Sequence, residues 1–594
     1  MRFFIYLLFI VVCSTTVCAQ SEMLAKNYFE QGQFEKALPI YKDLHEKNPS
    51  RRDYFLALVA TYQQLEQFEN AQQLLEHEIE TTRNDSTLFI ELGRNYNYLN
   101  DTETAELYYQ KAIEAIDTEP RWAYSIANAF ERHALLDKAV IAYKKGMELN
   151  PSANYHSQLA RLYGEQGQLE NMFESFLKIL EVNSKYLPIV IRNFGLYITE
   201  NPDNEANELL RKALLKRSQS NPDIMYNDLL TWLFIQQKEY GKAFVQQKAI
   251  YRRTKENMDE ILDLAQTTIQ SNAYDTANEI LQFAIENAPR ESQLLQAHRY
   301  KMHIAVTTAK KEDYGTVSQQ FEALISEFGN DELTFDLQLD YAAFLAFKAG
   351  DIPSAIAYLN EMKEREWSRY REATLLMNLA DVLIFDEKFN QALIYYSQVQ
   401  HKVKNDPLAQ EARYKIARAS YYKGDFTWAV TQLEVLKKST SQLIANDAME
   451  LNLLISDNSI EDSTQTALKK YAKADLLVLQ EKYEQANTIL EGILSEHSEE
   501  SIIDEALYKQ AEIFEKQHDY QKAVNNYLKI ADVYQDDILA DNAHFRLGEI
   551  YRVHLNLPEE AKTHYEAIIF NHADSIFFTE ARKQYRKLRG DVIQ

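Results

Sequence analysis

Histidine is the side chain in this sequence best suited to metal chemistry, because a neutral imidazole is a common zinc ligand. The chain has 13 histidines, and six of them follow residue 490. A zinc-binding His-Glu-x-x-His helix places two histidines four residues apart, and no such pair occurs. His554 and His564 could face each other across a helix pair, but no third ligand stands at a set spacing. We therefore expect surface histidines, no metal and no cofactor.

The sequence also lacks the motifs that are typical of other kinds of catalytic site. The chain has no Gly-x-Ser-x-Gly turn, phosphate-binding loop or dinucleotide fingerprint. Paired carboxylates such as Glu499-Glu500 and Glu559-Glu560 fall in expected turns or at expected helix starts. Acidic side chains interact favourably with a helix N-terminus, so these pairs need no catalytic explanation. The sequence predicts a protein that is not an enzyme.

The secondary structure that carries these residues can be predicted from a repeat in the sequence. Ala37, Ala71, Ala105 and Ala139 are each 34 residues apart, and an aromatic residue stands nine positions before each alanine. Apolar residues recur within each half at i, i+3/i+4 and i+7, which is helical spacing. Small residues let the two helices of a hairpin approach closely, and aromatic rings fill the space beside them. The pattern predicts helix hairpins stacked in a row.

The repeat continues with drift along the chain. The later anchor positions, 33 to 40 residues apart except for one gap of 57, are Met172, Ala206, Ala243, Ala277, Val317, Ala355, Ala392, Ala429, Ala486, Ala523 and Ala561. The long gap leaves room for one extra helix, which the apolar spacing places at residues 443–455. Gly (14) and Pro (11) are scarce, which also favours helix.

This pattern resembles the tetratricopeptide-repeat (TPR) family, whose 34-residue units have the same small and aromatic positions. The resemblance implies an all-α fold, an α-α superhelical solenoid of about 15 TPR-like helix hairpins in which each hairpin packs on its neighbours. The later spacing of 36–38 residues is similar to that of TPR proteins of bacterial envelopes.

The resemblance also implies a binding surface, because the first helix of each TPR hairpin lines a concave groove. Arginine and asparagine there would suit a peptide carboxylate or an extended backbone. The matching positions are Arg94, Asn97, Tyr98, Arg121, Tyr124, Asn128, Arg132, Asn154 and Arg161. A second stretch comprises Arg418, Tyr421 and Tyr422. The alternative is that these residues form ordinary solvated helix surface.

The first residues read as a signal peptide over residues 1–19. Arg2 precedes an apolar run from Phe3 to Val12, and Val17-Cys18-Ala19 then offers small residues before a cut ahead of Gln20. The run is too short to span a bilayer, which needs about 20 residues, and no later run approaches that length. We therefore expect an exported protein, periplasmic or at the outer-membrane periphery, with no transmembrane segment in the mature chain. The end of the signal resembles that of secreted Bacteroidota proteins.

The net charge and the cysteine content limit the classes of partner and of site that we expect for this chain. The net charge of −25 argues against nucleic acid, whose binding proteins carry basic faces. Both cysteines lie within the signal, so the mature chain is expected to have neither disulfides nor thiolate sites. Five cations lie between Arg582 and Arg589, and they fit either a solubilising cap helix or a helix that binds an acidic partner or membrane.

Two polar segments, at residues 218–223 and 457–463, interrupt the helical pattern and suggest how the chain is divided into domains. The expected parts are the signal peptide (1–19), an N-terminal TPR array of 34-residue repeats (20–219), a middle TPR-like array (220–457) and a C-terminal TPR-like array with a basic capping helix (458–594). The two polar segments could equally well be long loops within one continuous solenoid.

The function expected from these features is a non-enzymatic protein–protein interaction scaffold of the bacterial cell envelope. Its partners would be proteins or peptides, including outer-membrane or cell-wall machinery. The alternative is a helical carbohydrate- or nutrient-binding protein of the outer surface.

Overall fold

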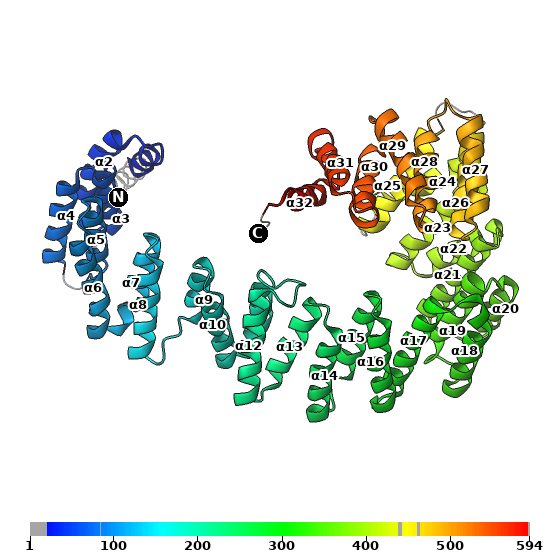
Figure 1. Cartoon of the computed structure of the whole chain (residues 1–594), viewed down its shortest axis with the longest axis horizontal. Helices are drawn as coiled ribbons and strands as arrows, with labels where there is room; N and C mark the ends of the chain where they lie inside the picture. Colours follow the sequence, from blue (N-terminus) through cyan, green and yellow to red (C-terminus); the bar gives the residue numbers. More distant parts are fainter. Residues whose placement is uncertain (1–20, 83–84, 438–441, 460–463, 592–594) are drawn as a thin grey trace, which may run out of the picture. The chain divides into compact units, whose positions relative to one another are not determined.

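The computed structural model describes residues 21–82, 85–437, 442–459 and 464–591, and these residues form helices joined by short turns (Figure 1). No strand occurs within those ranges. The expected signal peptide and both cysteines lie outside them. The chain divides into two compact units, residues 1–264 and 265–594, and α15 (Met258–Gln270) runs from the first into the second.

Unit 1 is a succession of short helices. Its helical segments are residues 21–30, α2 (Phe34–Lys47), α3 (Arg52–Gln64), α4 (Phe68–Thr81), α5 (Leu88–Tyr98), α6 (Thr102–Thr118), η1 (Pro120–Trp122), α7 (Ala123–Arg132), α8 (Leu136–Leu149), α9 (His156–Glu165), α10 (Leu169–Val182), η2 (Ser184–Tyr186), α11 (Leu187–Phe194), α12 (Glu205–Ser220), α13 (Ile224–Gln236) and α14 (Tyr240–Thr254).

Unit 2 is also a succession of helices, with a large apolar core from Leu295 to Ile550 and a smaller one formed by Ala561, Tyr565, Ile568 and Ala581. Its helices are α16 (Tyr274–Asn287), α17 (Glu291–Thr308), η3 (Lys311–Asp313), α18 (Tyr314–Phe328), α19 (Phe335–Ala343), η4 (Phe344–Ala349), α20 (Ile352–Lys363), α21 (Arg369–Phe385), α22 (Phe389–Lys402), α23 (Pro407–Lys423), α24 (Phe426–Leu436), α25 (Gln442–Asp457), α26 (Thr466–Leu479), α27 (Tyr483–Glu496), α28 (Ile503–Lys516), α29 (Tyr520–Val533), α30 (Ala540–Glu549), η5 (Ile550–His554), α31 (Pro558–Asn571) and α32 (Phe578–Arg589).

The repeat predicted from the sequence is present in the packing. Each of the anchor residues, from Ala37 to Ala561, is buried, with at most 4% of its surface exposed. Within each unit, consecutive helices such as α5 and α6 or α21 and α22 pack together as hairpins, and neighbouring hairpins contact each other. The predicted fold, an all-α solenoid of TPR-like hairpins, is therefore confirmed.

Two glycines show how closely the helices of a hairpin approach. A Cβ atom placed on Gly93 of α5 would lie 2.7 Å from the Tyr109 ring and 2.9 Å from the Ala105 carbonyl oxygen, both on α6. A Cβ on Gly548 of α30 would likewise lie 2.6 Å from the Tyr565 ring of α31. Any larger side chain at either position would push the two helices apart, which explains the small residue in the repeat.

The turn within many of the hairpins has the same backbone form. Five residues before the anchor, the chain takes a left-handed conformation, with φ of 72° at Gly32, 56° at Glu66, 63° at Asn100 and 55° at Ala134. The next amide closes the end of the first helix; for example, Gln33 donates to the Tyr28 carbonyl at 2.8 Å. This is the Schellman closure of a helix.

The extra helix predicted at 443–455 is confirmed as α25. It packs on α23 and α24, while α26 packs directly on α23. The stack of hairpins therefore continues from α23 to α26, with α25 added beside it. The domain limits suggested at 219 and 457 remain predictions: α12 continues through residue 219, and α25 ends at Asp457.

Within the described residues, no helix combines the length and apolar character needed to cross a bilayer.

Candidate binding surfaces of the repeats

The three first helices that carry most of the predicted binding residues lie next to one another. Glu91 of α5 places Oε1 2.9 Å from Nε2 of His133, which follows the end of α7. Glu131 of α7 forms an ion pair with Arg161 of α9. These contacts link α5 to α7 and α7 to α9.

The α5 residues bond mainly within their own hairpin. Arg94 donates to the Tyr98 hydroxyl of the same helix at 2.6 Å. Asn97 donates to the Tyr109 hydroxyl of α6 at 2.9 Å. The Tyr98 ring stacks on Phe68 with centroids 5.6 Å apart. One face of Tyr98 is thus covered, and about a third of its surface (37%) stays open to a partner.

The next four residues lie on or just before α7. Arg121 lies on the short turn η1 and is highly exposed, with Glu119 3.3 Å away. Tyr124 is half-exposed, and its ring lies 6.2 Å from that of Tyr143. Asn128 is half-buried, and Arg132 is exposed at the end of α7. Tyr124 and the two arginines are therefore accessible, but Arg121 does not belong to a first helix as the repeat register implied.

Asn154 and Arg161 have clear structural partners. The Asn154 side chain accepts a 3.1 Å hydrogen bond from the backbone N–H of His156 at the start of α9. Arg161 bonds to Glu165 at 2.8 Å as well as to Glu131. Its charge is balanced by two carboxylates, so Arg161 provides a fixed polar group rather than an unpaired cation.

A cavity of about 440 Å³ adjoins Arg161 between α9, α10 and α11. Of the nine predicted residues, Arg161 is the one that lines it. The sequence reasoning missed the other principal lining side chains, which are Phe176, Tyr186, Ile189, Asn193 and Tyr197. Gly164, which also lines the cavity, was the available signal, because a Cβ there would lie 2.8 Å from the Tyr197 hydroxyl.

The second predicted stretch is split by the structure. Tyr421 is buried in the core of unit 2, with 1% of its surface exposed. Arg418 and Tyr422, on the same helix α23, line a different cavity.

The histidines of unit 2 pair differently from the sequence expectation. His564 faces His544, with their Nδ1 atoms 3.1 Å apart, whereas His554 stacks on Tyr520 with centroids 4.1 Å apart. The predicted pairing of His554 with His564 is therefore wrong. His554 ends the π-helical turn η5, and a π-turn changes the register of a helix end. In the part of the chain that the structure describes, no three metal-binding side chains gather at one point.

Comparison with known proteins identifies the repeat. Two family models of the tetratricopeptide repeat match parts of the chain. One matches residues 23–50 and 505–537, and the other matches residues 87–118 and 153–186. The chain is 20% identical over 368 residues to the TPR repeat-containing protein YpiA of Bacillus subtilis (strain 168), covering 58% of this chain and 79% of that protein. It is 27% identical over 135 residues to the human protein O-mannosyl-transferase TMTC1, which covers 21% of this chain and 14% of that protein.

Comparison with solved structures finds matches at low TM-scores. The Naa15/Naa10 complex bound to HypK-THB matches with a TM-score of 0.32 at 12% identity, covering 96% of each chain. The APC/C hetero-tetramer Cut9-Hcn1 matches with a TM-score of 0.21 at 13% identity, again covering 96% of each chain. The TPR domain of P58(IPK) matches with a TM-score of 0.19 at 15% identity, covering 62% of this chain and 98% of that one.

Proposed function

We propose that this chain of tetratricopeptide repeats is an exported scaffold that holds a protein partner in the bacterial cell envelope, and that the partner binds along α5, α7 and α9 of unit 1. Its TPR repeats support a scaffold for protein–protein interaction.

The cavity between α9, α10 and α11 is the observation that carries the proposal. Its volume of about 440 Å³ is within the usual range of about 300–1,000 Å³ for binding pockets. Tyr186 and Ile189, at its edge, expose nearly half of their surfaces. Partly exposed aromatic and aliphatic groups around a preformed cavity suit an apolar anchor side chain of a partner.

The fixed polar groups beside this cavity suit the rest of a bound segment. Arg161 is held in place by Glu131 and Glu165, so little side-chain entropy is lost when it contacts a partner. Tyr124 and Arg132 on the neighbouring α7 are accessible and extend the surface away from the cavity. An extended peptide could then place its anchor in the cavity and its backbone across α7.

Site-specific photo-cross-linking in cells tests the surface. A benzoylphenylalanine at Ile189 is expected to capture a defined protein, and the same group at Ile141 of α8, which is equally exposed, serves as the control. Capture at both positions alike, or glycan retention without any captured protein, would contradict the proposal. Once the partner is known, Ile189→Asp should weaken its binding by about tenfold or more, while Ile141→Asp should leave it unchanged.

The envelope location is tested separately by fractionating cells and sequencing the N-terminus of the protein. We expect it outside the cytoplasm, with Gln20 as its first residue. Recovery from the cytoplasm with residues 1–19 intact would contradict export without affecting the binding surface.

A further inference from the structure

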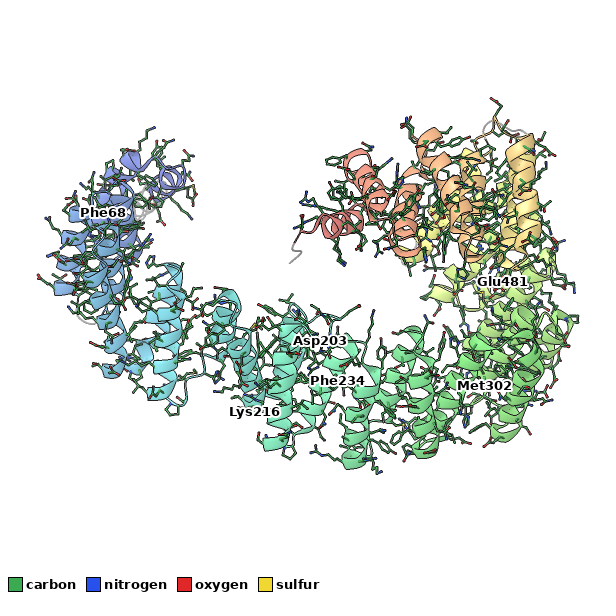
Figure 2. The ribbon with its side chains drawn as sticks, in the orientation of Figure 1. Phe68, Asp203, Lys216, Phe234, Met302 and Glu481 are labelled. Atoms are coloured by element: carbon green, nitrogen blue, oxygen red, sulfur yellow. The ribbon has the colours of Figure 1, made fainter. Side chains whose placement is uncertain are left out.

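A second cavity, of about 390 Å³, lies within unit 2 between η4, α21, α22, α23 and the turn after α26. It exists because distant segments of the unit meet. Lys348 of η4 pairs with Glu481 at 3.4 Å, although 133 residues separate them. The Gln480 amide also donates to the Phe385 carbonyl at 2.8 Å. Glu481, labelled in Figure 2, lies where Figure 1 labels α21 and α22.

The cavity has an apolar side and a charged side, and the charged side contains the cations Lys348, Lys415 and Arg418 together with the carboxylates of Asp381 and Glu481. Phe347, Ile384, Phe385 and Leu479 supply the apolar surface. Phe347 and Leu479 are more than a third exposed, so this surface is accessible from solvent. A ligand with an aromatic or branched aliphatic group would bury these side chains on binding. The favourable free energy would be roughly 25 cal/mol for each Å² of apolar surface removed from water.

Two of the three cations in the cavity wall are neutralised. Lys415 bonds to Asp381 at 2.7 Å and to Glu411 at 3.3 Å. Lys348 pairs with Glu481. Neither lysine needs a further anion to balance its charge.

Arg418 is different. Its guanidinium donates to the Tyr422 hydroxyl of the same helix and lies over that ring, 5.4 Å from the centroid. Among the described residues, no carboxylate lies within 4.0 Å of its nitrogens. Burial lowers the pKa of Arg418, but Tyr422 and Asp475 raise it by more, so the side chain stays charged. A largely enclosed cation with a phenol as its bonded neighbour is stabilised by an added anion.

We propose that this cavity binds a carboxylate carried on an apolar or aromatic group, with the carboxylate on Arg418 and the apolar group against Phe347, Ile384 and Phe385. Guanidinium and carboxylate match in geometry and can form two parallel hydrogen bonds. The volume admits one such group rather than a long chain. The ligand is either a free small acid or the last residue of a peptide, since both offer the same chemistry. This site lies in unit 2 and does not depend on the surface proposed for unit 1.

Calorimetric titration of the purified full chain with N-acetylphenylalanine and with its amide tests the charge requirement. The acid should bind at least about tenfold more tightly than the amide, because the amide cannot accept a charge-assisted bond from Arg418. Equal affinity of the two, or no binding of the acid, would overturn the proposal. A peptide ending in phenylalanine forms the second arm: tighter binding than the free acid identifies a chain end as the ligand, and weaker binding identifies a small acid.

Arg418→Met tests the residue, because methionine keeps much of the bulk without the charge. We expect a loss of affinity for the acid of about tenfold or more. Arg582→Met, at an exposed position on α32, is the matched control and should bind as the wild type does. If Arg418→Met fails to fold, Phe347→Ala replaces it, since Phe347 is partly exposed; it should weaken acid and amide binding equally. Unchanged binding of the acid by a folded Arg418→Met or by Phe347→Ala would contradict the assignment.

Discussion

The Tyr143 hydroxyl of α8 donates a 2.9 Å hydrogen bond to the carboxylate of Glu131 on α7, twelve residues earlier. Arg161 on the following first helix pairs with the same carboxylate. The arrangement recurs in unit 2, where Tyr527 of α29 donates to Glu515 of α28 at 2.7 Å and Arg546 of α30 pairs with Glu515. One carboxylate thus links both helices of its own hairpin to the next hairpin.

This three-part link predicts a measurable contribution to stability. Tyr527 is fully buried, and Tyr527→Phe removes only the hydroxyl that bonds to Glu515. We expect the free energy of unfolding to fall by about 1.5–3 kcal/mol, the usual value for a hydrogen bond to a charged group. Denaturant unfolding measures it, with Tyr370→Phe at an exposed position as the control. Equal midpoints for both variants would show that the link contributes nothing.

The close approach at Gly548 predicts a second effect. Gly548→Ala would place a methyl group 2.6 Å from the Tyr565 ring, and overpacking of this kind costs about 1–3 kcal/mol. Gly492 in α27 has no atom within 4 Å of the same added carbon. Gly492→Ala should therefore stabilise the protein by about 0.5–1 kcal/mol through reduced backbone entropy. Opposite shifts in melting temperature are expected, and shifts of the same sign would show that the hairpin is looser than the structure indicates.

The left-handed turns predict a stabilising substitution. Ala134 has a φ of 55°, which brings its Cβ close to the carbonyl oxygen. Ala134→Gly relieves this strain at some cost in backbone entropy, so a net gain of about 0.5–1 kcal/mol is expected. Ala115→Gly, inside α6, should instead lose about 1 kcal/mol. Chemical denaturation of the two variants measures the difference, and a loss of stability in Ala134→Gly would contradict the argument.

The fold could be predicted from the sequence because the constraint is local and repeated. The position occupied by Ala105 requires a small residue because two helices touch there, and the equivalent position in the other repeats is buried in the same way. The left-handed turns were not foreseen at Glu66 or Ala134, because the helix closure imposes a conformation that those residue types do not favour.

The candidate sites were less predictable for a physical reason. The repeat register marked Arg161 as facing a groove, but its neutralisation depends on Glu131, thirty residues away on a neighbouring helix. The cavity at Arg418 depends on the meeting of Lys348 and Glu481, and no repeat period specifies that contact. Sequence spacing locates a side chain on its own helix, whereas charge balance and cavities arise between helices.

His544 and His564 indicate how stability should change in mild acid. Burial lowers the pKa of each to about 4, and the nearby His564 and His572 contribute further to the lowering at His544. In the unfolded chain both would have a pKa of about 6.5. The unfolded chain therefore binds more protons between these values. Stability should be complete above about pH 6.5 and should be lost progressively as the pH falls towards 4.

Replacing both histidines should remove most of this loss. His544→Gln combined with His564→Gln removes both of these imidazoles, so the drop in unfolding free energy between about pH 7.5 and about pH 5 should shrink by up to about 4 kcal/mol. His401→Gln, at an exposed position on α22, should keep the wild-type pH dependence. Denaturant titrations at the two pH values give the comparison. If the double variant and the control lose equal stability in acid, protonation of other groups causes the acid sensitivity.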